Sequence, residues 1–138
     1  YYYKNEYENI NPFTWNKSTH KTIDTISQPI LDISTNQTTG RKSLGGKSVI
    51  VNRLAATYGN LLFINSNRLG RYEPDESSEL KSIIDVYDIV EGIYLLSFTI
   101  DRYNKEQFLD FQVYGEDIYV LMNQDLRHFR IKNKSKWK

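Results

Sequence analysis

The chain contains no cysteine, and this absence excludes several kinds of protein. Without cysteine there is no disulfide scaffold, no thiolate nucleophile and no cysteine-ligated zinc or iron–sulfur site. Histidine is almost as scarce, since His20 and His128 are the only two and lie far apart in the sequence. Neither predicts a metal site, because such sites need several ligands at characteristic spacings. We therefore expect no metal and no other cofactor.

The chain also lacks a strong charge of either sign and any long hydrophobic run. Eighteen Lys and Arg residues nearly balance 17 Asp and Glu residues, for a formal net charge of +1. This balance argues against a nucleic-acid partner. No run approaches the roughly 18 apolar residues that would span a bilayer, so no membrane span is expected. Aromatic residues are plentiful, with 11 Tyr, 6 Phe and 2 Trp, and they suffice for the core of one compact domain or of part of a larger one.

Short apolar runs separated by turn residues predict an all-β protein. The expected strands span residues 50–58, 61–65, 83–89, 93–100, 108–113, 118–121 and 126–131. Gly59-Asn60 and Gly115-Glu116 each separate two runs, as the tight turn of a β-hairpin does.

The polar first part of the chain, residues 1–43, is only weakly periodic. Its pattern indicates short strands near 21–26 and 30–33. The stretch 36–47 carries three glycines and is predicted to be a loop flanked by strands.

One segment fits two kinds of secondary structure. Residues 76–90 place apolar side chains at helical spacing, and a serine precedes them as a possible N-cap. The same segment is rich in β-branched and aromatic residues, which favours a strand over 83–89. We prefer the strand, and the helix stays open as the alternative.

An internal repeat is the most informative feature of the sequence. Residues 58–67 (YGNLLFINSN) align without a gap with residues 114–123 (YGEDIYVLMN), at an offset of 56 residues. The following strands also correspond, 84–89 to 126–131. The first copy carries the insert 68–81 between these two strands.

A four-stranded antiparallel unit that repeats about every 40 to 55 residues is typical of a β-propeller blade. One small sheet cannot cover both of its apolar faces, whereas neighbouring blades stacked face to face can. The hypothesis divides the chain into an incomplete blade with a glycine-rich loop (1–47), a complete four-stranded blade (48–100), a final three-stranded blade (101–132) and a basic tail (133–138).

Four segments within these units carry a resemblance to a known family. They are 60–67 (NLLFINSN), 84–88 (IDVYD), 92–98 (GIYLLSF) and 117–121 (DIYVL). With them the chain resembles the six-bladed, TolB-like β-propeller proteins common in Bacteroidetes, over about residues 48 to 131.

The resemblance implies a location and a general role. Members are exported to the periplasm or cell surface, often through a lipid anchor, and act as binding or interaction modules more often than as enzymes. Two to three blades are too few for a six-bladed ring. We therefore expect the chain to be the C-terminal blades of a longer parent chain, part of a homo-oligomer, or a short form.

No catalytic or phosphate-binding motif emerges from the sequence. The stretch 40–48 (GRKSLGGKS) ends like a phosphate-binding P-loop, but five residues instead of four separate its glycines. A pair of carboxylates near a propeller axis could bind calcium or act as acid and base. The candidates are Asp85, Asp88, Asp101, Asp110, Glu116 and Asp117, which show no calcium-loop spacing, and a structural or solvated role is expected for them.

The insert 68–81 and the strand before it are the predicted place of ligand recognition, because loops on a rigid scaffold carry binding residues. The segment offers donors, acceptors and an aromatic ring that suit a sugar or a peptide. The candidate ligand-binding residues are Asn65, Asn67, Arg68, Arg71 and Tyr72.

Three functional hypotheses follow. The first is a non-enzymatic, exported β-propeller module that binds a protein or carbohydrate ligand. The second is a structural piece that completes a larger propeller ring. The third is a glycan or peptide hydrolase or lyase that uses paired carboxylates such as Asp85, Asp88 and Asp110, or Tyr87. We rank them in this order.

Overall fold

The structure is a computed structural model that describes residues 6–22, 31–67, 80–103 and 106–132. Within these residues the strands form four small antiparallel sheets, which confirms the prediction of an all-β fold. The strands are β1 (Glu6–Ile10), β2 (Lys17–Lys21), β3 (Ile33–Thr35), β4 (Lys42–Leu44), β5 (Asn52–Tyr58), β6 (Leu61–Ser66), β7 (Lys81–Asp88), β8 (Ile93–Asp101), β9 (Phe108–Tyr114), β10 (Asp117–Met122) and β11 (Asp125–Arg130).

β5 to β8 form a four-stranded meander in sequence order. β7 is buried along most of its length, because Ile84 and Val86 face one side of the sheet and Tyr87 faces the other. Such two-sided burial suits β-branched and aromatic residues. The strand prediction is therefore confirmed over Lys81–Asp88, and the helical alternative is wrong there; residues 76–79 lie outside the described residues.

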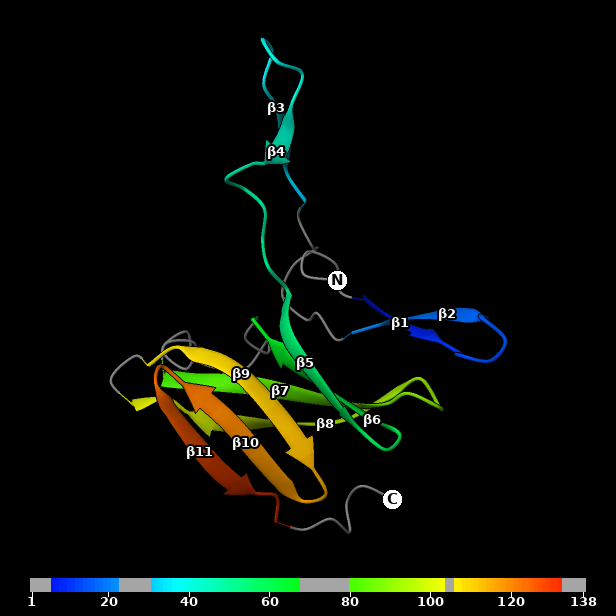
Figure 1. Cartoon of the computed structure of the whole chain (residues 1–138), viewed down its shortest axis with the longest axis vertical. Helices are drawn as coiled ribbons and strands as arrows, with labels where there is room; N and C mark the ends of the chain where they lie inside the picture. Colours follow the sequence, from blue (N-terminus) through cyan, green and yellow to red (C-terminus); the bar gives the residue numbers. More distant parts are fainter. Residues whose placement is uncertain (1–5, 23–30, 68–79, 104–105, 133–138) are drawn as a thin grey trace.

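β9, β10 and β11 form a three-stranded sheet that packs against the four-stranded sheet (Figure 1). Phe63 and Ile84 of the larger sheet share one core cluster with Phe111, Ile118 and Val120 of the smaller sheet. All five side chains are almost completely buried. Each sheet therefore covers an apolar face of the other.

The repeat predicted from the sequence is a structural repeat, down to the pairing of residues. Equivalent pairs are Tyr58↔Leu61 and Tyr114↔Asp117, Leu62↔Tyr87 and Ile118↔Phe129, and Asn65↔Ile84 and Leu121↔Leu126. Even the irregularity recurs, because the pairing skips Arg53 in β5 and Leu109 in β9, which are equivalent positions. The two sheets thus share one blade-like architecture. They lie within the predicted units 48–100 and 101–132, except that β8 extends to Asp101.

The first part of the chain forms two separate hairpins, β1–β2 and β3–β4. The prediction that all of 36–47 is loop is wrong, because Lys42–Leu44 pairs with Ile33–Thr35 as β4 with β3. That hairpin extends away from the sheets in Figure 1, with both strands exposed. The strand expected near 30–33 begins later, at Ile33, and most of the strand expected at 21–26 lies outside the described residues.

The β1–β2 hairpin lies against the face of the four-stranded sheet opposite to the three-stranded one. Tyr7 of β1 is buried among Leu62, Ile64 and Tyr87. Burial of its hydroxyl raises the pKa of Tyr7, and Asp88 raises it further. The larger sheet is therefore covered on both faces.

Three hairpin turns share one geometry that the sequence patterns did not predict. In each turn an Asn or Asp side-chain oxygen accepts hydrogen bonds from the backbone N–H groups two and three residues later. A residue with positive φ then closes the turn through its N–H. The first and closing residues are Asn11 and Trp15 between β1 and β2, Asn36 and Gly40 between β3 and β4, and Asp88 and Gly92 between β7 and β8.

Substitution of Gly92 tests how the β1–β2 hairpin docks on this turn. A Cβ atom at Gly92 would lie 2.4 Å from His20 Nδ1 of β2, whereas a Cβ at Gly115, which also has positive φ, meets nothing within 4 Å. We expect Gly115→Ala to lower the free energy of unfolding by about 1 kcal/mol through backbone strain. Gly92→Ala should lower it further, because His20 must move. Equal losses in urea unfolding would contradict this docking.

Phe63 and Tyr119 occupy equivalent positions, but only Phe63 lies in the contact between the two sheets. We expect Phe63→Ala to lower the free energy of unfolding by about 3–5 kcal/mol, because it leaves a cavity between the sheets. Tyr119→Ala should cost under about 1 kcal/mol, as is usual for a surface position. Chemical denaturation of the two variants measures the difference, and similar costs would show that the sheets do not pack on each other in this way.

Candidate functional site

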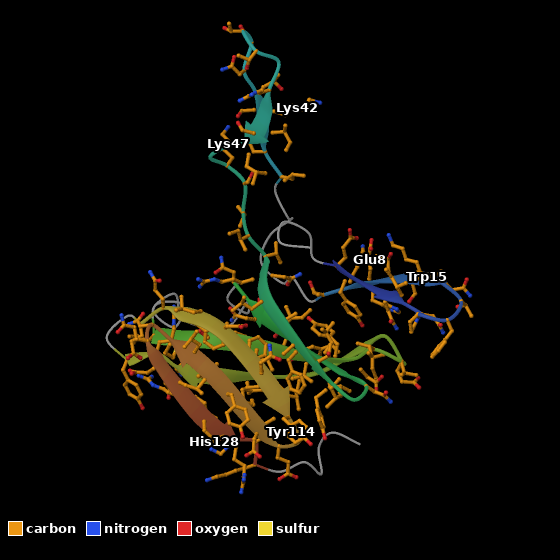
Figure 2. The ribbon with its side chains drawn as sticks, viewed as in Figure 1. Glu8, Trp15, Lys42, Lys47, Tyr114 and His128 are labelled. Atoms are coloured by element: carbon orange, nitrogen blue, oxygen red, sulfur yellow. The ribbon has the colours of Figure 1, made fainter. Side chains whose placement is uncertain are left out.

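Polar and aromatic side chains gather on the face of the three-stranded sheet that points away from the core, here called the outer face. Along a strand, side chains alternate between the two faces, so one set lies in the core and the other faces outward. The outer face consists of Asp110, Gln112, Tyr114, Asp117, Tyr119, Leu121, Leu126, His128 and Arg130. Figure 2 shows Tyr114 and His128 toward the same end of this sheet.

Asp117 is the electrostatic centre of the outer face. Its Oδ1 accepts a hydrogen bond from Arg130 Nε at 3.0 Å and lies 2.7 Å from His128 Nε2. These hydrogen bonds, that of His128 first, lower the pKa of Asp117, and the same carboxylate raises the pKa of Arg130. The carboxylate is therefore ionised at neutral pH and holds both neighbouring side chains in place.

Two tyrosines add aromatic surface beside this cluster. The ring of Tyr119 stacks on His128, with centroids 5.1 Å apart and planes 19° apart. Tyr114 meets Tyr58, the equivalent residue of the first copy, edge to face at 5.6 Å. Because His128 contacts both Asp117 and Tyr119, the aromatic and the charged parts of the outer face form one connected group.

Comparison of the two copies shows why the outer face differs from an ordinary contact between blades. In the four-stranded sheet, four buried apolar residues on the equivalent face contact the next sheet. The corresponding pairs are Ala56 and Gln112, Phe63 and Tyr119, Ile84 and Leu126, and Val86 and His128. Three of the four positions become polar or amphipathic. The outer face therefore resembles the polar face of a capping repeat more than a second dry core.

The structure describes two of the five predicted ligand-binding residues and gives both a local contact. Asn65 is buried, and its side-chain amide donates to the carbonyl of Ile83 at 3.0 Å. Asn67 is exposed, and its amide donates to the carbonyl of Ile50 at 3.2 Å. The other three, Arg68, Arg71 and Tyr72, lie outside the described residues. Ligand binding by this set stays a prediction.

The carboxylates proposed as a catalytic pair take part in separate local interactions. Asp88 accepts hydrogen bonds from the N–H groups of Val90 and Glu91, and Asp110 accepts one from the N–H of Phe111. Asp85 is buried and accepts a hydrogen bond from the hydroxyl of Ser97.

Tyr87, the other proposed catalytic residue, is buried in the core. Among the described residues, no three His, Asp or Glu side chains come together as a metal site would require. In the same part of the chain, no helix is long and apolar enough to cross a membrane.

The sequence itself contains a signal for the outer face. Residue-by-residue comparison of the two copies pairs Phe63 with Tyr119 and Val86 with His128. An apolar residue replaced by an amphipathic one, on the same face of an equivalent strand, marks a face with a different environment. No family model, no curated protein and no solved structure matches the chain, so no relative assigns a role to these residues.

The lowered pKa of Asp117 predicts a pH dependence of stability. A carboxyl group whose pKa is lower in the folded than in the unfolded chain stabilises the fold above its unfolded pKa, about 3.9. This contribution disappears as the pH falls through the folded-state pKa. We expect stability of the native chain to fall more steeply with acidification than that of Asp117→Asn, as measured by urea unfolding between about pH 5 and pH 2.

His128→Ala provides the matched check on the cause. Removal of the imidazole should raise the pKa of Asp117 toward its ordinary value, as followed by the carboxyl carbon signal in NMR. An Asp117 signal that titrates identically in both proteins would contradict the assigned hydrogen bond.

Proposed function

We propose that the chain is a non-enzymatic binding module built from β-propeller blades, and that it recognises a glycan through the outer face. The observation that carries the proposal is the replacement of an apolar contact face by a connected group of aromatic and charged side chains at equivalent positions. As the resemblance to TolB-like propellers implies, we place its action in the periplasm or at the cell surface.

The chemistry of the outer face suits a sugar. Tyr119, with 39% of its surface exposed, offers an aromatic ring on which the C–H face of a sugar ring can lie. Gln112 pairs directly opposite Tyr119 and brings both a donor and an acceptor. Asp110 and Arg130 lie on the same face and can exchange hydrogen bonds with hydroxyl groups. The carboxylates of Asp110 and Asp117 outnumber the single Arg130, so the outer face has no excess of positive charge, which favours a neutral glycan over a polyanion.

A second candidate function is that of a structural piece of a larger propeller. The observation in its favour is the faithful repetition of strand register, because stacked repeats normally continue through equivalent faces. Leu126, which replaces Ile84 of the first copy, is 71% exposed and would then be covered by another blade. On this reading the outer face contacts protein instead of sugar.

Binding to immobilised glycans, followed by calorimetry with the sugars that bind, tests the first candidate. We expect Tyr119→Ala to weaken binding at least about tenfold, because it removes the stacking surface. Tyr94→Ala is the matched control, since Tyr94 is 40% exposed but belongs to β8 of the other sheet. It should bind as the native chain does.

Two outcomes would overturn glycan recognition by the outer face. One is equal loss of binding in the Tyr94 and Tyr119 variants. The other is absence of binding to any glycan, together with a dimer or larger assembly in light scattering that Leu126→Asp dissociates. The second outcome would establish the structural candidate.

A further inference from the structure

The tip of the β1–β2 hairpin, residues 10–16, exposes large apolar side chains to solvent. Phe13 and Trp15 are 91% and 77% exposed, and Ile10 is about half exposed. The tip, with sequence INPFTWN, contains no charged residue, and Lys17 follows it directly. In Figure 2, Trp15 lies at the end of the hairpin, away from the packed sheets.

The backbone at Trp15 adopts a conformation that no other bulky residue has in the described part of the chain. Its φ is 60°, in the left-handed region that strongly favours glycine. The two turns of the same geometry place Gly40 (φ 66°) and Gly92 (φ 68°) at this position. Such strain persists where something outweighs it, commonly a function. With Trp15 so exposed, packing within the chain does not outweigh the strain.

The shape and charge of the tip decide which partner fits it. A stable protein interface buries about 800 Å² on each side, which a seven-residue turn cannot supply. A bilayer interface needs only a few side chains, because Trp favours the headgroup level and apolar groups enter the acyl boundary. An uncharged tip suits this depth, and Lys17 at its base lies where a basic side chain can remain among headgroups.

We propose that the β1–β2 tip inserts Phe13 and Trp15 into the interface of a lipid bilayer and so holds the module at a membrane surface. The attraction is mainly apolar, because Lys17 is paired with Glu8 at 2.5 Å and the tip itself is neutral. Zwitterionic lipid is therefore sufficient, and salt has little effect on binding. The inference does not depend on glycan recognition, since the outer face belongs to a different sheet.

The test uses the full chain with Trp137→Phe, so that Trp15 is the only tryptophan. On addition of phosphatidylcholine vesicles, we expect the Trp15 emission to shift to shorter wavelength and brominated lipid to quench it. Phe13→Ser in the same background should lower the partition constant at least about tenfold, because the Phe side chain that would be buried in the bilayer interface is lost. Ile33→Ser is the control, since Ile33 is also an exposed apolar residue, at 48%, but lies on β3 of the other hairpin. It should leave partition unchanged.

Trp15→Gly separates this role from a structural one. Glycine fits the turn at least as well as tryptophan, so the thermal midpoint should not fall, while co-sedimentation with vesicles drops at least about tenfold. Unshifted Trp15 emission in the presence of vesicles would overturn the proposal. So would a Trp15→Gly chain that sediments with vesicles as the native chain does, or that loses binding only together with its thermal stability. Tyr119→Ala, which should weaken the proposed glycan binding, should leave vesicle binding intact.

Discussion

The structure depends on the contact between two thin sheets. A small antiparallel sheet has two faces and no interior of its own, so at least one face must be buried against another element. Here Phe63 and Ile84 of the four-stranded sheet meet Phe111 and Val120 of the three-stranded sheet in one continuous core. The β1–β2 hairpin covers the opposite face of the larger sheet through Tyr7. Without these contacts neither sheet would bury enough apolar surface to be stable.

The same constraint explains why the two copies of the repeat are similar in backbone and different in surface. Strand pairing, the tight turns and one irregularity recur at equivalent residues, because they are local requirements of the same sheet. The face toward the preceding unit also stays apolar in both, with Ile64 and Val120 at equivalent positions and fully buried. The other face changes its character, because Phe63 and Val86 of the first copy are replaced by Tyr119 and His128 of the second.

The three related turns make the same distinction between geometry and surface. Each needs a side-chain acceptor at its first residue and a positive φ at its fifth, which is a backbone requirement. Two of them satisfy that requirement with glycine, which has no side chain to present. The third places an exposed tryptophan there. A bulky, exposed side chain where the two related turns have glycine is the observation behind the proposed membrane contact.

Much of the fold was determined by the sequence alone, because alternation, tight-turn glycines and the internal repeat are local patterns. They predicted the strands of both sheets and the correspondence between 58–67 and 114–123. The structure also has a strand that these patterns did not predict, Lys42–Leu44, which pairs with Ile33–Thr35 across the local Asn36 turn. Tertiary structure decided the rest. It showed Asn65 buried against a backbone carbonyl, and joined Asp117, His128 and Tyr119, whose meeting depends on how β10 pairs with β11. Which side chains meet across strands depends on strand register and packing, and local sequence patterns do not specify either of them.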